Sequence, residues 1–403
     1  MVNSGDTTWV LISTALVILM TPALAFFYGG MVRKKNLLST LMLSVVILCL
    51  ISIQWVLYGY SLAFGPDKGG LIGSLKWAGL IGVGQTPNVD YAATIPHLAF
   101  MVFQLAFAVI TPALITGAFV ERIGFTGFLM FTLLWATIVY DPVAHWVWGI
   151  GGWLRNLGAL DFAGGTVVHI TAGITALAVA LVVGKRKGYG KYPMEPSNIP
   201  LTVLGAFLLW FGWFGFNGGS ALTCGGLATS AFVVTNTAAA AAGLTWMILS
   251  WTHKRPSVLG LATGAVVGLV GITPASGFVS PLSSIIIGSV AAIISYYAIL
   301  IRVKTGLDDS LDVFACHGMG GITGALATGL FAEKAINAAG NNGLFFGNPG
   351  QFTVQLTAVI SIAAFAFVVS FVLAKVVDAV FSLRARPEEE EVGLDISQHG
   401  ETA

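Results

Sequence analysis

Residues 161–175 read DFAGGTVVHITAGIT, and residues 309–323 read DSLDVFACHGMGGIT. In each stretch an aspartate, Asp161 or Asp309, precedes a histidine, His169 or His317, by eight residues, and a Gly-Ile-Thr triplet begins four residues later. All matched positions are 148 residues apart, so the stretch is an internal repeat. Each copy begins a long apolar segment. If that segment is helical, its histidine lies about 12 Å deeper than its aspartate, at about 1.5 Å per residue.

The composition places these stretches in a membrane protein. Of 403 residues, 56% are hydrophobic and 9% are charged, whereas about a quarter are charged in an ordinary soluble domain. The 50 glycines suit membrane helices that pack through small faces. A net charge of +1 gives no reason to expect a nucleic-acid partner. We interpret Cys49, Cys224 and Cys316 as small core residues, because all three lie in apolar runs.

Apolar runs long enough to cross a bilayer recur along the chain. The first, from Trp9 to about Met31, is followed rather than preceded by basic residues, so we expect a true membrane helix, not a cleaved signal, and a mature chain that starts at or near Met1. Segments of about 20 residues number eleven, at 9–31, 37–64, 92–120, 125–148, 162–184, 199–221, 228–251, 257–274, 281–301, 311–332 and 352–383.

Lysine and arginine are unevenly distributed among the connections. Of the 19 such residues, 14 follow odd-numbered segments or lie in the tail, and four follow even-numbered segments. Because basic loops stay in the cytoplasm, we expect the N-terminus outside the plasma membrane and the C-terminus inside. The two copies of the repeat begin segments five and ten, so they enter from opposite faces. Segments one to five and six to ten are therefore predicted inverted repeats, with segment eleven added, and such repeats hold a substrate path between them.

These boundaries predict an all-α transmembrane domain over 1–383, with repeats at 1–184 and 199–332, a last helix at 352–383, and a cytoplasmic tail over 384–403. Four consecutive glutamates, Glu388 to Glu391, are typical of a solvated, partly disordered end. No connection has room for a soluble domain.

His169 and His317 are the leading functional candidates, because titratable side chains are costly inside a membrane. Polar helix packing is the ordinary alternative, but the paired arrangement favours one shared site. A haem-binding electron carrier is the other alternative. Two histidines leave a metal short of ligands, and no further ligands recur at suitable spacing, so we expect neither a cofactor nor a metal.

The other candidates have an ordinary role beside a functional one. Asp161 and Asp309 occupy positions typical of helix N-caps, but a carboxylate at such a position would also stabilise a cation bound near the pore. Trp148 fits an interfacial aromatic belt, although its ring face suits a cation. Taken alone, phenylalanines such as Phe103 and Phe107 are core or lipid-facing residues.

Longer motifs surround these residues: FFYGG at 26–30, AHWVWG at 144–149, DFAGGTVVH at 161–169, WFGFNGGS at 213–220 and DVFACHG at 312–318. Together with GLD at 393–395 and HGE at 399–401, they resemble the ammonium transporter family (Amt/Mep/Rh), on its Amt side, over essentially the whole chain. The resemblance implies a transporter rather than an enzyme. It also implies a homotrimer in membrane lipid, with eleven helices and a separate pore in each subunit, and methylammonium as a substrate analogue.

The resemblance also implies roles for particular residues. Trp148, Phe107 and Ser220 match the outer binding site for ammonium, to which we add Phe103. The gate of stacked rings is matched by Phe107 and Phe216. His169 and His317 match the twin histidines of the pore, and Asp161 matches a structural acid, to which we add Asp309 and Asp312 as supporting acids.

The mechanism follows as an expectation. A pore lined by apolar side chains and two neutral imidazoles excludes potassium, which cannot lose its charge, whereas ammonium can lose a proton and pass as NH3. The resemblance implies that the cytoplasmic loops and tail dock a PII-type signalling protein. An ammonium sensor of the same fold is the alternative function. It predicts an added signalling domain or altered pore residues, and the sequence shows neither.

Overall fold

The computed structural model describes residues 1–253 and 255–403; Lys254, one of the basic connecting residues counted above, lies outside them. The described chain is mostly helical, with one small hairpin of β1 (Asp67–Lys68) and β2 (Ile72–Gly73). Its α-helices are α1 (Ser4–Met31), α2 (Leu37–Gln54), α3 (Tyr60–Phe64), α4 (His97–Ile115), α5 (Phe125–Trp135), α6 (Asp141–Trp148), α7 (Trp153–Leu157), α8 (Thr171–Val183), α9 (Ile199–Gly219), α10 (Gly226–His253), α11 (Val258–Ile272), α12 (Pro281–Thr305), α13 (Gly320–Phe331), α14 (Pro349–Phe381) and α15 (Pro387–Val392).

Short π-helical turns extend several of these helices. They are η2 (Trp55–Gly59), η5 (Ala136–Tyr140), η6 (Gly165–Ile170), η7 (Phe314–Met319) and η9 (Asp395–His399). The turn η6 leads into α8, and η7 leads into α13. Both copies of the sequence repeat therefore begin with the same uncommon helical form, which is frequent at functional sites.

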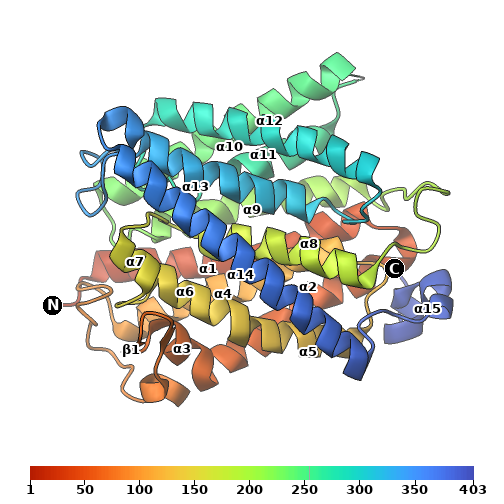
Figure 1. Cartoon of the computed structure of the whole chain (residues 1–403), viewed down its shortest axis with the longest axis horizontal. Coiled ribbons are helices and arrows are strands. Elements are labelled where there is room, and N and C mark those ends of the chain that lie inside the picture. The colour runs from red at the N-terminus through yellow and green to blue at the C-terminus, as the bar shows by residue number, and fades with distance from the viewer. Residues whose placement is uncertain (254) are drawn as a thin grey trace.

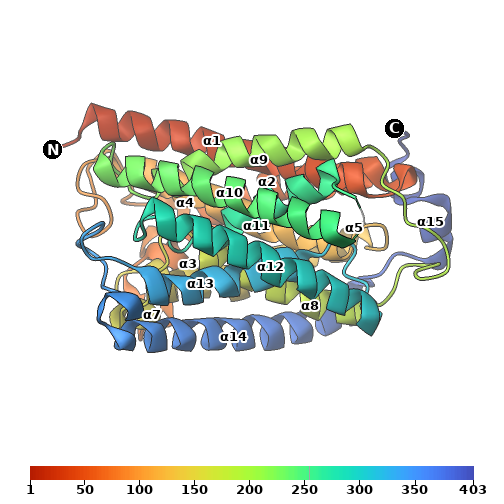
Figure 2. The same ribbon diagram turned by 90° about the horizontal axis from the view of Figure 1, so that it is seen from above.

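The long helices run side by side along the long axis of the molecule (Figures 1 and 2). The N-terminus lies at one end of this bundle, and the tail with α15 lies at the opposite end (Figure 1). We call these two ends of the bundle the N-terminal end and the C-terminal end. Within the described residues, nine helical segments are long and apolar enough to cross a membrane, and α11 is a shorter apolar helix. A multi-pass membrane protein is confirmed. The count of eleven spans and the inverted repeat stay predictions.

Large apolar side chains cover the outside of the bundle. Ile53, Phe211, Leu244 and Val368 are between 54% and 63% exposed. A soluble monomer rarely exposes so much apolar surface, whereas helices in a bilayer present such side chains to lipid.

Glycines allow helices α1 and α9 to pack closely. A Cβ atom on Gly30 would lie 2.4 Å from the carbonyl oxygen of Asn198, and one on Gly205 would lie 2.3 Å from the backbone nitrogen of Phe27. Close backbone approach through small residues is typical of membrane helices. Because α1 opens the first predicted half of the chain and α9 opens the second, the two halves meet along this contact.

A buried charge cluster joins three connections at the C-terminal end, and Arg33 from a fourth connection, after α1, pairs with it. Arg186 Nη2 lies 2.8 Å from Asp308 Oδ1, and Arg186 Nη1 lies 2.6 Å from Glu121 Oε2. Arg33 Nε approaches Glu121 Oε1 at 2.9 Å, and Arg122 lies 3.9 Å from Asp308. The cluster ties the connection after α4 to those after α8 and α12.

The tail is folded against the C-terminal end of the bundle, so the prediction of a solvated, partly disordered tail was wrong. Asp395 accepts hydrogen bonds from the backbone N–H groups of Leu38 (3.0 Å) and Ser39 (2.7 Å), at the start of α2. Glu390 is 2% exposed and pairs with Arg384 at 2.6 Å. Asp395 therefore satisfies free helix N–H groups and Glu390 pairs with a partly exposed arginine, so neither acid simply faces water.

The interpretation of the three cysteines as core residues was wrong for two of them. Cys49 and Cys224 are exposed, and Cys316 is buried. Cys49 lies on α2, and an apolar run does not reveal which face of its helix lies inward, because a membrane helix can be apolar all round. Cys224 lies in the connection between α9 and α10 rather than in a helix.

Candidate functional site

Asp161 organises the chain that leads to His169. Its Oδ1 atom accepts the backbone N–H groups of Gly164 (2.8 Å) and Gly165 (2.7 Å), and its Oδ2 atom accepts that of Thr166 (2.8 Å) and also the Thr166 hydroxyl. Gly164 has a φ of +113°, which suits glycine. The carboxylate thus holds the free N–H groups at the start of η6.

The second copy of the repeat builds a related support for His317. Asp309 Oδ2 accepts the backbone N–H of Phe314 at 2.7 Å, at the start of η7. Asp312 has a φ of +59°, uncommon for a residue other than glycine. Its Oδ1 atom lies 2.7 Å from Arg302 Nε on α12. The predicted acids therefore contact backbone N–H groups or an arginine and do not touch the imidazoles.

The two π-helical turns bring His169 and His317 into contact. Their Nδ1 atoms are 3.3 Å apart, and their ring planes are inclined by 19°. The two residues are 0% and 3% exposed. A contact between two ring nitrogens is a hydrogen bond only when one carries the proton and the other accepts it. Two neutral imidazoles meet this condition by holding a single proton between the Nδ1 atoms.

Aromatic rings and a glycine position this pair. Trp213 and Phe216 on α9 stack on the His169 ring, with centroids 5.4 and 6.0 Å away. A Cβ atom on Gly173 would lie 2.0 Å from the backbone nitrogen of Gly318, so α8 and η7 touch backbone to backbone. His169 Nε2 is buried and has no hydrogen-bond partner among the described residues.

A cavity of about 340 Å³, named here the Trp148 cavity, is lined by residues that include Trp148 at the end of α6 and Arg155 on α7. The helix α7 lies at the N-terminal end of the bundle (Figure 1). Phe107 and Ser220 also line this cavity. The Trp148 indole N–H donates to the Asp161 carbonyl at 2.9 Å, which holds the ring in place. The Ser220 hydroxyl donates to the Phe216 carbonyl at 2.8 Å. Its oxygen lone pairs therefore remain free to accept hydrogen bonds.

Phe107 lines this cavity, and its ring centroid lies 4.4 Å from that of Phe216, which is not among the lining residues. Beyond them lies a void of about 10 Å³, which His169 and His317 line. The predicted gate pair thus stands between the Trp148 cavity and the imidazoles. Phe103 packs edge-on against Phe107 at 5.0 Å and is not among the lining residues of the cavity, so it supports the gate from behind.

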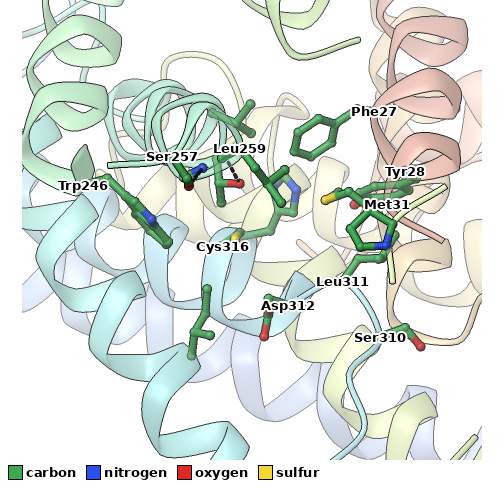
Figure 3. A pocket seen from close by; sticks show the side chains of 16 residues that line it. Phe27, Tyr28, Met31, Trp246, Ser257, Leu259, Ser310, Leu311, Asp312 and Cys316 are labelled. Carbon is green, nitrogen blue, oxygen red and sulfur yellow. Dashed lines mark hydrogen bonds between the residues drawn. The ribbon is translucent and has the colours of Figure 1, made fainter. Parts of the chain in front are cut away.

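A second cavity, of about 330 Å³, reaches His317 from the C-terminal end and is named the Asp312 cavity. Figure 3 shows Phe27 and Tyr28 on one side of it and Trp246 on the other. Asp312 contributes a carboxylate to its lining. The histidine pair therefore lies between two cavities that approach it from opposite ends of the bundle.

Two site residues were missed in the sequence. Gln104 on α4 lines the Trp148 cavity, and Trp213 stacks on His169. Gln104 could have been found as an uncharged polar residue inside a predicted apolar segment. Trp213 lies in one of the quoted motifs, but a tryptophan in an apolar run does not reveal whether it faces lipid or a pore.

Comparison with known proteins identifies the family. The model of the Ammonium Transporter Family matches residues 8–403. An ammonium transporter of Bacillus subtilis (strain 168) is 52% identical over 401 residues, which cover 99% of this chain and 98% of the relative. The crystal structure of Candida albicans Mep2 has a TM-score of 0.91 at 38% identity, covering 96% of this chain and 88% of that chain.

A structure described as a sensor Amt protein is also similar, with a TM-score of 0.89, 31% identity and 98% of both chains covered. Its identity is lower than that of the Bacillus transporter. The resemblance inferred from the motifs is confirmed over almost the full length. The chain therefore belongs to the ammonium transporter family.

Proposed function

We propose that this ammonium transporter binds NH4+ in the Trp148 cavity, removes one proton, and passes NH3 along His169 and His317 to the Asp312 cavity. The histidine pair relays the proton separately. One observation carries the proposal: two imidazoles with Nδ1 atoms 3.3 Å apart line a narrow void, the Asp312 cavity reaches His317, and the Trp148 cavity reaches Phe107, whose ring packs on Phe216 beside that void.

Binding of the cation is supported by the groups in the Trp148 cavity. The face of an indole ring attracts a cation with about 1 to 2 kcal/mol when the site is partly desolvated. Ser220 adds a hydroxyl oxygen with free lone pairs. These groups recognise a small cation without a formal negative charge, so the bound ion is not held too tightly to move on.

The narrow stretch beyond Phe107 and Phe216 favours a neutral molecule. Its void of about 10 Å³ is near the smallest space that can hold one water molecule. A potassium ion would lose its hydration shell there without gaining new ligands, at a cost of several kcal/mol or more. Ammonium escapes this cost, because an apolar site favours the neutral form of a basic group.

The proton follows a separate route through the rings. His169 takes up a proton at Nε2 and gives the shared proton to His317 Nδ1. His317 then releases a proton from its own Nε2 toward the Asp312 cavity. One proton enters and one leaves, and the pair never holds two positive charges, which would be strongly disfavoured at this separation.

The same proposal includes the topology and the domain boundaries. Eleven spans, arranged as inverted repeats over 1–184 and 199–332 with a last helix at 352–383, are supported by the eleven apolar segments and by the matching turns η6 and η7. The N-terminus lies outside the plasma membrane, and the tail over 384–403 lies in the cytoplasm, as the basic connections indicate.

Partners complete the proposal. A homotrimer in lipid would cover part of the apolar flank of the bundle. A PII-type signalling protein would meet the C-terminal end, where the folded tail lies beside the connections after α1 and α8. Methylammonium is the expected substrate analogue.

An ammonium sensor is the second candidate function, because a sensor Amt protein has a similar structure. The two cavities that approach the histidines favour transport, since a receptor needs a binding cavity on only one side. Transport is also favoured by the higher identity to the Bacillus subtilis transporter.

Currents in liposomes that contain the purified protein test the mechanism. Ammonium pulses should evoke currents, and labelled methylammonium should accumulate and compete with ammonium. Uptake with no net charge moved per substrate would overturn the separate proton relay. A protein that took up neither compound would be a sensor rather than a transporter.

A further inference from the structure

Gln104 has the position of a ligand in the Trp148 cavity. It lies on α4, three residues before Phe107, and it lines the cavity together with Trp148 and Ser220. Its Oε1 atom is buried and has no hydrogen-bond partner among residues 1–253 and 255–403. A buried amide oxygen without a partner costs about 1 to 3 kcal/mol, so its retention calls for an explanation.

No hydrogen bond within the described part of the chain fixes the orientation of the Gln104 amide, so a ligand can determine it. The oxygen and nitrogen ends of an amide have nearly the same shape, and their hydrogen-bond partners decide which way they point. No such partner for the buried end exists in the described part of the chain. Turning the amide by half a rotation, so that Oε1 faces the cavity, exchanges one unpartnered buried end, Oε1, for the other, the NH2 group, and loses no hydrogen bond inside the protein.

The other polar groups of the cavity already have partners or lack acceptor atoms. The Tyr91 hydroxyl donates to one backbone carbonyl at 2.8 Å and accepts a backbone N–H at 3.0 Å. The side-chain oxygen of Asn337 accepts the backbone N–H of Ala339 at 3.1 Å. Arg155 has donors only. Ser220 thus offers the other free acceptor opposite Trp148.

Ammonium needs such acceptors, because it has four N–H donors and no lone pair. The face of Trp148 and the hydroxyl of Ser220 leave donors unsatisfied once water is stripped from the ion. We propose that Gln104 is a further ammonium-binding residue of this cavity, with its Oε1 atom accepting one N–H of the ion. This inference rests on the proposed binding of NH4+ in the Trp148 cavity.

The amide also suits the next step. A neutral oxygen holds ammonium less strongly than a carboxylate would, since a nearby negative charge favours the protonated form. Gln104 therefore lowers the cost of desolvating the ion beside the Phe107 ring without preventing the loss of its proton.

Labelled methylammonium uptake into liposomes tests the inference, with ammonium as the competitor. Gln104→Leu removes the acceptor and should raise the ammonium concentration for half-inhibition about tenfold, the loss of one hydrogen bond of about 1.4 kcal/mol. Its maximal uptake should stay within about twofold of the wild type. Gln104→Glu retains an acceptor and adds a negative charge, so its affinity should be at least that of the wild type, whereas its maximal uptake should fall because the carboxylate favours the protonated ion. Gln85→Leu is the matched control, because Gln85 is exposed and is not among the lining residues of the cavity, and it should leave the affinity unchanged.

An unchanged affinity in Gln104→Leu, with normal uptake, would overturn the role of Gln104 and leave the proposed transport mechanism standing. A wild-type protein without uptake would overturn both. If Gln104→Leu does not fold, Gln104→Met has a similar length without an amide oxygen and carries the same expectation. Equal losses in Gln104→Leu and Gln104→Glu would show a packing role and would also overturn the inference.

Discussion

His317 and His169 are 148 residues apart in the sequence, and their Nδ1 atoms are 3.3 Å apart in the structure. Each ring is carried by its own π-helical turn, and each turn is started by its own aspartate. The contact therefore depends on the packing of two separate halves of the chain. Changes to the rings and changes to the packing between them should have separable effects.

Replacing both rings should change ion selectivity more than stability. His169→Asp or His317→Glu places a carboxylate in the narrow stretch, which would compensate the charge of a dehydrated cation, so potassium flux should appear. His169→Leu with His317→Leu should abolish ammonium-driven currents, because no titratable ring remains to carry the proton. Currents and rubidium uptake in liposomes measure both effects. Unchanged potassium exclusion in His169→Asp and in His317→Glu would place the selectivity filter elsewhere.

Gly173→Ala should separate the rings without altering them. The new Cβ atom would meet the backbone nitrogen of Gly318 at 2.0 Å, and backbone cannot move aside cheaply. Overpacking of this kind costs about 1 to 3 kcal/mol, so the thermal midpoint should fall together with the ammonium current. Gly226→Ala is the control, since nothing lies within 4 Å of its added Cβ. A normal current in Gly173→Ala would show that the 3.3 Å contact is dispensable.

Arg186→Met should destabilise the C-terminal end of the bundle. Arg186 is 7% exposed and bonds to both Glu121 and Asp308. Its removal leaves two buried carboxylates with less compensation, a change that costs about 3 to 5 kcal/mol. Thermal unfolding of the purified protein measures the loss. Lys187→Met removes the neighbouring pair with Glu391, which is exposed, and should leave the midpoint unchanged.

The same cluster predicts a loss of stability in acid. Burial alone would raise the pKa of Glu121 and of Asp308. For Glu121, the charge of Arg186 and the hydrogen bonds from Arg33 outweigh burial and lower the pKa from its ordinary value of 4.5. For Asp308, the hydrogen bonds from Arg186 and the charge of Arg122 outweigh burial and lower the pKa from its ordinary value of 3.8.

A carboxyl group whose pKa is lowered on folding contributes its full stabilisation at any pH above its pKa in the unfolded chain. It loses that contribution as the pH falls through its pKa in the folded protein. The thermal midpoint should therefore be nearly constant between about pH 5 and 7 and should fall below about pH 4. Arg186→Met should show a shallower fall, because its carboxylates are no longer held ionised. An equal slope in both proteins would assign the acid sensitivity to other groups.

Several parts of this protein could be predicted from its sequence because they depend on local properties. Membrane helices consist of long runs of apolar residues, and these runs predicted helices whose bounds are close to those of α1, α9 and α14. His169 and His317 stood out because titratable residues are rare in such runs. The tail was misjudged, because Asp395 finds its partners, Leu38 and Ser39, more than 350 residues away in the chain.

By itself the sequence determined the class of protein, the apolar segments and the two histidines, since hydropathy and an internal repeat depend only on the order of residues along the chain. Only the tertiary structure decided which side chains meet: the Nδ1 contact, the Phe107 and Phe216 rings beside it, and the amide of Gln104 in the Trp148 cavity. The reason is physical. A helix that is apolar all round can be rotated without changing its hydropathy, and packing against the other half of the chain selects the rotation.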